Sequence, residues 1–102
     1  MSITIVTKEN YEHEVLNSTK TVLLDFYADW CGPCRLLSKA IDEIAAEYPE
    51  YKVCKVNVDD QQELAAEFQV MTIPSLFVIK GGKVVNQSVG VKPKAQILNM
   101  LG

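Results

Sequence analysis

The sequence predicts an α/β fold with a mixed central β-sheet, parallel in its first part and antiparallel in a C-terminal hairpin, flanked by four helices on both faces. Two observations support this prediction. Strand-like and helix-like segments alternate through the first two thirds of the chain, which is typical of a parallel sheet. Two further strand-like segments then flank Gly81-Gly82, a dipeptide that suits a two-residue hairpin turn. With 102 residues, the chain is expected to form one domain, residues 1–102.

The N-terminal segments provide the first strand, the first helix and the central strand of this prediction. Residues 2–6 alternate Ile and Thr over a few positions, which indicates a short strand. A helix is expected over residues 8–17, with Thr7 as its N-terminal cap. Residues 21–28 (TVLLDFYA) carry apolar side chains at odd and even positions, the pattern of a strand covered on both faces. This strand is therefore predicted to lie centrally in the sheet.

A long amphipathic helix is predicted after the central strand. Apolar residues recur at spacings of three and four positions from Cys34 to Ala45, and Pro49 stops the helix after Tyr48. Pro33 falls at the start of this helix, where proline is well tolerated.

The remaining elements are predicted from the same kinds of pattern. They are a strand over 52–58, a short helix through Phe68, hairpin strands over 75–80 and 83–88, and a helix from Pro93 to Leu101. Asp59, Asp60 and Glu63 are expected to cap the short helix and to place negative charge at its N-terminus.

Composition and charge exclude several functional classes. Apolar residues make up 48% of the chain and charged residues 23%, as in ordinary folded domains. The net charge is −3 and the basic residues are scattered, so no surface for nucleic acid is expected. No apolar run approaches the roughly 18 residues of a membrane span, and the first residues do not resemble an export signal. We therefore expect a cytoplasmic protein with no nucleic-acid or membrane partner.

Two cysteines, Cys31 and Cys34, are separated only by Gly32 and Pro33. The chain has three cysteines, too few for the disulfide framework of a small secreted protein, so the close pair indicates redox chemistry or metal binding. The pair lies between the central strand and the long helix, where sites in parallel sheets collect. Cys31 would cap that helix, whose dipole and unpaired N–H groups would stabilise a thiolate.

This arrangement suits thiol–disulfide exchange. Cys31 would attack a substrate disulfide, and Cys34 would resolve the mixed disulfide by attacking Cys31. Cys34, one turn later, is expected to be the more buried thiol, still protonated when Cys31 ionises and donating a hydrogen bond to it.

Asp25 interrupts the apolar central strand six residues before Cys31. A carboxylate there should be desolvated with a raised pKa, and it would be able to take the Cys34 proton, with Lys55 as its counter-charge. A buried polar group with a purely structural role is the alternative. Ile73-Pro74 directly precedes a strand, so its peptide bond is either an ordinary trans strand entry or a cis bond.

Other residues allow competing interpretations. The cysteine pair is half of a tetrahedral zinc site, which only Cys54 and His13 would be able to complete, at spacings unlike those of a zinc ribbon. Cys54 is more simply a small buried hydrophobic residue, and His13 a solvated one. Trp30 and Met71 are either packing residues or parts of a docking surface, which we favour. A binding module with an idle disulfide is a further alternative.

The segments FYADWCGPCR (26–35) and TIPS (72–75), with Gly82, Gly90 and the element order, closely resemble the thioredoxin family over essentially the whole chain. WCGPC between a buried strand and a helix, with an Asp six residues upstream and an Ile-Pro forty residues downstream, is a highly specific combination. The resemblance implies the thioredoxin fold and a protein-disulfide reductase without cofactor or metal. The Gly-Pro dipeptide favours a reductant over the oxidants and isomerases that share the motif frame.

The resemblance also implies roles for individual residues. Cys31 would be the nucleophile, Cys34 the resolving thiol, Asp25 the buried proton acceptor and Lys55 the lysine near that acid. Pro74 would be cis and would pack against the cysteine pair. Substrate chains would bond to the backbone at Ile73 and lie across an apolar surface. That surface would consist of Trp30, Gly32, Pro33, Ile73, Pro74, Gly90 and Val91.

Partners follow from the same resemblance. Electrons would come from a thioredoxin reductase. Ribonucleotide reductase, methionine sulfoxide reductases and peroxiredoxins are the typical recipients. We expect the chain to act as a monomer.

Overall fold

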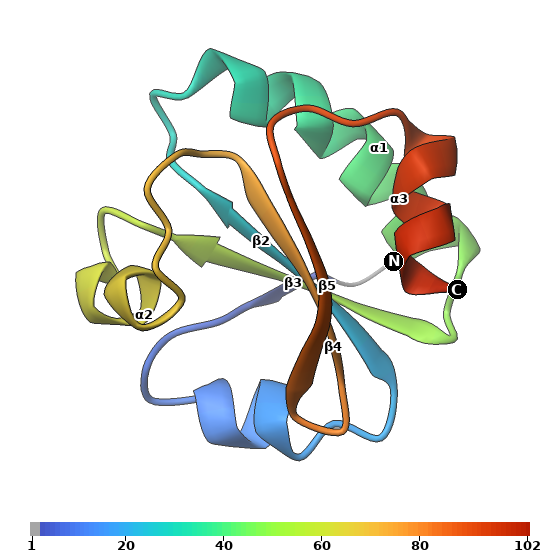
Figure 1. Cartoon of the computed structure of the whole chain (residues 1–102), viewed down its shortest axis with the longest axis horizontal. Helices are drawn as coiled ribbons and strands as arrows, with labels where there is room; N and C mark the ends of the chain where they lie inside the picture. The colour runs from blue at the N-terminus through green and yellow to red at the C-terminus, as the bar shows by residue number, and fades with distance from the viewer. Residues whose placement is uncertain (1–2) are drawn as a thin grey trace.

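The computed structural model describes residues 3–102, which form a five-stranded mixed sheet with helices against both faces (Figure 1). The strands lie in the order β1-β3-β2-β4-β5. They are β1 (Thr4–Ile5), β2 (Thr21–Tyr27), β3 (Tyr51–Asn57), β4 (Ser75–Lys80) and β5 (Lys83–Val89). β3 is parallel to β1 and β2, whereas β4 is antiparallel to β2 and β5. The predicted fold class is confirmed; residue 2 of the first predicted strand lies outside the described residues.

Helical segments within residues 3–102 cover both faces of this sheet (Figure 1). They are η1 (Glu12–Leu16), α1 (Gly32–Glu47), α2 (Gln62–Glu67) and α3 (Lys94–Leu101). Buried residues of η1 and α2 share a core with the even-numbered residues of β2. Buried residues of α1 and α3 share a second core with Leu23 of β2 and Val53 of β3. The helices therefore divide into two pairs, one on each face.

Strand β2 is covered on both faces, as its apolar pattern predicted. Its five inner residues, 22–26, are all buried. Because side chains alternate along a strand, Leu23, Asp25 and Tyr27 share one face, and Leu23 packs there with residues of α1. Asp25 is thus placed beneath the helix that carries the cysteine pair.

Two glycines make the tight turn between β4 and β5. Gly81 and Gly82 have φ angles of +57° and +80°, which side chains with a Cβ atom rarely adopt. Lys80 and Lys83 pair directly across this two-residue turn, as predicted.

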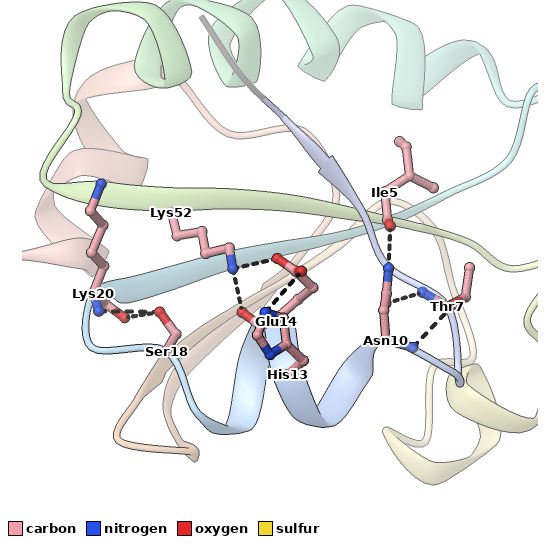
Figure 2. Close-up of polar contacts among 8 residues, drawn as sticks. All are labelled: Ile5, Thr7, Asn10, His13, Glu14, Ser18, Lys20 and Lys52. Carbon is pink, nitrogen blue, oxygen red and sulfur yellow. Dashed lines mark hydrogen bonds and ion pairs between the residues drawn. The ribbon is translucent and has the colours of Figure 1, made fainter.

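The first helix is shorter than predicted and begins later. Thr7 and Asn10 bond reciprocally: Thr7 N–H donates to Asn10 Oδ1 at 2.8 Å and Asn10 N–H donates to Thr7 Oγ1 at 3.3 Å (Figure 2). Asn10 Nδ2 also donates to the Ile5 carbonyl at 3.0 Å. Thr7 therefore accepts an N–H three residues on, as a cap does, but these bonds hold residues 7–10 in a turn. The helix forms only from Glu12 and has π-type hydrogen bonding.

One lysine joins η1 to the sheet. Lys52 Nζ on β3 donates to the Glu14 carbonyl at 2.9 Å and to the Glu14 carboxylate at 2.6 Å (Figure 2). Both side chains are three-quarters buried, so this contact holds the short helix against β3 although it has only one buried residue, Val15.

The predicted caps of the short helix α2 are wrong in part. Asn57 Oδ1 accepts the backbone N–H groups of Asp59 at 2.9 Å and Asp60 at 3.3 Å, so these residues lie in a turn that precedes the helix. Helix α2 begins at Gln62 with no side-chain cap, and only Glu63 supplies negative charge in its first turn. The other elements agree with the predicted boundaries to within one or two residues.

Candidate active site

Cys31 is the N-cap residue of α1 and forms a disulfide with Cys34. The two Cα atoms are 5.2 Å apart. Cys31 Sγ accepts the backbone N–H of Cys34 at 3.2 Å. Gly32 and Pro33 occupy the first two helical positions, where the missing N–H of proline leaves no bond unmade. The local sequence therefore places a sulfur against the N–H groups and the positive end of α1, as predicted.

The two cysteine residues are about equally buried. Cys31 is 4% exposed and Cys34 is 6% exposed, so the expectation that Cys34 is the more buried cysteine is wrong for this disulfide form. The physical reason is the cap geometry: Cys31 Sγ turns back toward the first helical turn and not out to solvent. Both cysteines pack with Ala28 in a small group that we call the cysteine cluster, with Val58 and Ile73 at its edge.

Asp25 lies opposite Lys55 in the register of β2 and β3. Asp25 is only 1% exposed, and its Oδ1 has no hydrogen-bond partner among residues 3–102. Burial raises the pKa of this carboxyl group from 3.8 to about 7, and the charge of Lys55 opposes that rise. The desolvation, the raised pKa and the counter-charge predicted from the sequence are all present.

Lys55 acts on Asp25 across a distance and not through a hydrogen bond. Within residues 3–102 its ammonium donates to Ser38 Oγ at 3.0 Å, and it lies 5.1 Å from the centroid of the Tyr27 ring. No ion pair shorter than 4.0 Å joins Lys55 to Asp25 in this part of the chain. The counter-charge is therefore held by neighbours that the sequence analysis did not assign.

The segment before β4 lies beside the cysteine cluster. The Ile73–Pro74 peptide bond is cis, as the resemblance implied, and Ile73 packs against the cluster. Gly90 N–H donates to the Pro74 carbonyl at 2.8 Å, and Gly90 has a φ of +92°. This bond brings the turn of Gly90 and the exposed Val91 next to residues 73 and 74, so the segments of the predicted substrate surface adjoin one another.

Trp30 and Met71 are both surface residues. Trp30 is 68% exposed, and its Nε1 donates to Asp59 Oδ2 at 2.8 Å. Met71 is 93% exposed. An indole anchored at its polar edge and otherwise open to solvent favours the docking interpretation over the packing one.

Sequence reasoning missed three residues of this site: Ser38, Tyr27 and Asp59. Ser38 carried a signal, because it stands four residues after Cys34 and its side chain is thus on the same stripe of α1. Tyr27 lies two residues after Asp25 and therefore on the same face of β2. Asp59 carried no such signal, since its contact with Trp30 joins segments 29 residues apart.

Cys54 and His13 do not join the cysteine pair. Cys54 is fully buried in the core under η1 and α2, where desolvation raises its pKa to about 11, so it is a packing residue and not a ready nucleophile. The His13 side chain is 85% exposed. In the described part of the chain, no three His, Cys, Asp or Glu side chains gather as metal ligands would.

A disulfide at the start of a helix, beside a cis-proline segment and above a buried acid, defines the class of thiol–disulfide oxidoreductases. Known proteins agree with this class. A sequence model of the thioredoxin family matches residues 2–102. The chain is 43% identical to thioredoxin of Pyropia yezoensis over 102 residues, 99% of this chain and 95% of that protein.

Two bacterial relatives are similar to the same degree. Thioredoxin of Haemophilus influenzae is 43% identical over 97 residues, which cover 94% of this chain and 91% of that protein. Thioredoxin of Streptomyces clavuligerus is 44% identical over 93 residues, which cover 91% and 87%. The chain belongs to the thioredoxin family, and it is a protein thiol–disulfide oxidoreductase.

None of the helices in the described residues has the length and apolar content that crossing a bilayer requires.

Proposed function

We propose that this chain reduces disulfides of protein substrates through the Cys31–Cys34 couple and is itself re-reduced by a thioredoxin reductase. One observation carries the proposal: the disulfide closes at the cap of α1, where Cys31 Sγ accepts a backbone N–H. A thiolate at this position is stabilised by the helix dipole and by unpaired N–H donors, and this stabilisation favours attack at neutral pH.

The proposed reaction has two steps. In the first, the Cys31 thiolate attacks one sulfur of the substrate disulfide, forms a mixed disulfide, and releases the other substrate sulfur as a thiolate that takes a proton from water. In the second, Asp25 takes the Cys34 proton, and the Cys34 thiolate attacks Cys31 Sγ. The bond from Cys31 to the substrate breaks, the second substrate sulfur leaves as a thiolate with the electron pair of that bond, and the Cys31–Cys34 disulfide forms. Asp25 then returns its proton to solvent. The substrate gains two electrons, which the dithiol loses.

Substrate chains are proposed to lie beside the cysteine pair. The exposed indole of Trp30, the open helix start at Gly32 and Pro33, and the adjoining segments 73–74 and 90–91 support this position. In this proposal the backbone at Ile73 pairs with the substrate chain. An extended substrate would then be fixed before Cys31 attacks it.

The proteins that receive the electrons and the cellular compartment are proposed from the family resemblance. Ribonucleotide reductase, methionine sulfoxide reductases and peroxiredoxins are the candidate recipients. A reducing compartment such as the cytoplasm suits a chain in which Cys54 remains a free buried thiol. We further propose that the chain acts as a monomer and that residues 1–102 are one domain, whose apolar side chains lie in two cores against one sheet.

The reduction potential of the Cys31–Cys34 couple tests the direction of electron flow. We expect a value below about −230 mV, because the reduction potential of a general reductant must be lower than the potentials of glutaredoxins and disulfide isomerases. The measurement is equilibration in dithiol–disulfide buffers, read by alkylation and mass. A potential of about −120 mV would show that the protein is an oxidant.

A Cys31→Ser, Cys34→Ser double variant tests the alternative of a binding module with an idle disulfide. If this variant kept partner binding and full biological activity, the protein would be such a module.

Removing the Asp59 carboxylate should weaken substrate binding. In Asp59→Ala the indole loses its hydrogen bond, so an exposed contact worth about 0.5–1 kcal/mol disappears and KM for a disulfide-containing protein should rise about two- to fivefold. We expect kcat to stay unchanged, since the sulfurs are untouched. Asp60→Ala is the matched control, because it removes the same charge from the next residue, which makes no side-chain hydrogen bond to Trp30 within residues 3–102. Equal KM values in both variants would contradict a role for the Trp30–Asp59 bond.

A further inference from the structure

A polar group lies on the inner side of α1, one turn beyond the cysteines. Cys34 and Ser38 are four residues apart on α1 and so share one stripe of the helix. Facing that stripe, β2 and β3 place Asp25 and Lys55 side by side. The Ser38 hydroxyl accepts a hydrogen bond from Lys55 Nζ at 3.0 Å, which links the helix to the sheet at this point.

Cys34, Ser38 and Lys55 also line one cavity, whereas Asp25 is not among its lining residues. The cavity has a volume of about 220 Å³. Its lining residues are Tyr27, Ala28, Asp29, Cys34, Arg35, Ser38 and Lys55. Lys55 and Cys34 thus line the same cavity, and the Lys55 ammonium lies between the Ser38 hydroxyl and the Tyr27 ring. Ser38 is the hydrogen-bond acceptor that keeps it there.

We propose that Ser38 is a positioning residue, which holds the Lys55 ammonium in this cavity and thereby sets how readily Asp25 accepts the Cys34 proton during resolution of the mixed disulfide. The inference rests on the proposed function. Asp25 Oδ1 has no partner of its own among residues 3–102, so the charge of Lys55 is the main favourable influence on the ionised carboxylate.

The direction of the effect follows from solvation. A lysine ammonium without an acceptor in a partly apolar space is better solvated in water, and the cavity is open to solvent. Without the Ser38 hydroxyl, Lys55 would extend outward, and Asp25 would lose part of its opposing charge. The carboxyl group would then hold its proton to a higher pH, and less carboxylate would be present at pH 7 to accept the proton of Cys34.

Titratable and charged groups lie on several of the elements that pack near Asp25. On β3 the facing group is Lys55, and on β4 the paired residue is apolar Leu76. On α1 the groups are Cys34 and, at the cavity, Arg35, whose guanidinium donates to the Asp29 carbonyl. At the end of β2 they are Tyr27 and Asp29. Of these, Lys55 is the cation that opposes the rise in the Asp25 pKa, and it is the one that Ser38 holds.

The test compares Ser38→Ala with Ser38→Thr, which keeps a hydroxyl, and with Lys39→Ala, an exposed neighbour on the same helix. The Asp25 pKa is read from its carboxyl ¹³C shift in the oxidised protein, and the resolving step from single-turnover release of a mixed disulfide between pH 5 and 9. We expect the Asp25 pKa to rise in Ser38→Ala and resolution at pH 7 to slow about twofold, since a rise of about half a unit halves the ionised fraction. The rates should converge near pH 9, and Ser38→Thr and Lys39→Ala should match the parent.

A second background decides whether Ser38 acts through Lys55. In Lys55→Gln the ammonium is absent, so adding Ser38→Ala should produce no further shift of the Asp25 pKa. An unchanged Asp25 pKa in Ser38→Ala, a fall, or a full shift that persists in Lys55→Gln would each overturn the proposal. The titration needs no substrate. A parent protein that reduces no disulfide would therefore refute the proposed function while the titration still decides the coupling.

Discussion

A Cys34→Ser variant is expected to remain covalently joined to its substrates. Cys31 keeps its place at the cap of α1, so it still attacks a substrate disulfide, but no second sulfur stands one turn away to resolve the product. Well-oriented intramolecular groups reach effective concentrations of about 10⁵ M or more, which a free thiol at about 1 mM cannot replace. We expect steady-state reduction to fall by on the order of 10³-fold or more, with a mixed disulfide of one-to-one stoichiometry detected by mass.

Two variants give this experiment its controls. Cys31→Ser should form no mixed disulfide, because Cys34 lies within the helix and not at its cap. Cys54→Ser should trap nothing and should turn over normally, since Cys54 is buried away from the pair in the core under η1 and α2. A Cys34→Ser protein that still turns over at the parent rate, or a Cys31→Ser protein that traps substrate, would show that the two roles are wrongly assigned.

The second large effect concerns stability and pH. Asp25 has a pKa of about 7 in the folded protein and an ordinary value of 3.8 when exposed. Between these values the folded state holds a proton that the unfolded state has lost, so the free energy of unfolding falls as the pH rises. The contribution is fully present below about pH 4 and is lost by about pH 7 or just above. A difference of about 3 pK units corresponds to a loss of about 4 kcal/mol.

Asp25→Asn should abolish this dependence. The amide does not titrate, so the free energy of unfolding of the variant relative to the parent should increase by about 4 kcal/mol between pH 4 and pH 8. Urea unfolding of the oxidised proteins at both pH values measures the difference. Comparing the two pH values cancels any constant effect of burying an amide. Asp42→Asn, on the exposed side of α1, should follow the parent at both values. A variant whose pH dependence equals that of the parent would mean that Asp25 ionises as an exposed carboxylate does.

Much of the fold was predictable because its signals are local. Apolar side chains at both odd and even positions of residues 21–28 identified the buried strand, and Gly81-Gly82 identified the hairpin. The predicted start of the first helix was wrong, because the side chains of Thr7 and Asn10 form hydrogen bonds that compete with those of a helix. The caps of α2 were wrong in part because Asn57 accepts the N–H groups of the following residues and forms a turn there. Each error arose where a polar side chain bonds to nearby backbone.

The features of the active site also fall into those that could be predicted from local signals and those that could not. Spacing and hydrophobic pattern were enough to predict the cysteine pair at a helix start and an acid in an apolar strand, because both signals lie within one segment. The folded chain was needed to show that Lys55 donates to Ser38, that Trp30 donates to Asp59, and that Cys31 is as buried as Cys34. These contacts join residues on different elements. Which acceptor a long polar side chain bonds to depends on its solvation and on which groups lie within its reach. A pattern within one segment does not show which acceptor lies within reach, because that depends on how the elements pack against one another.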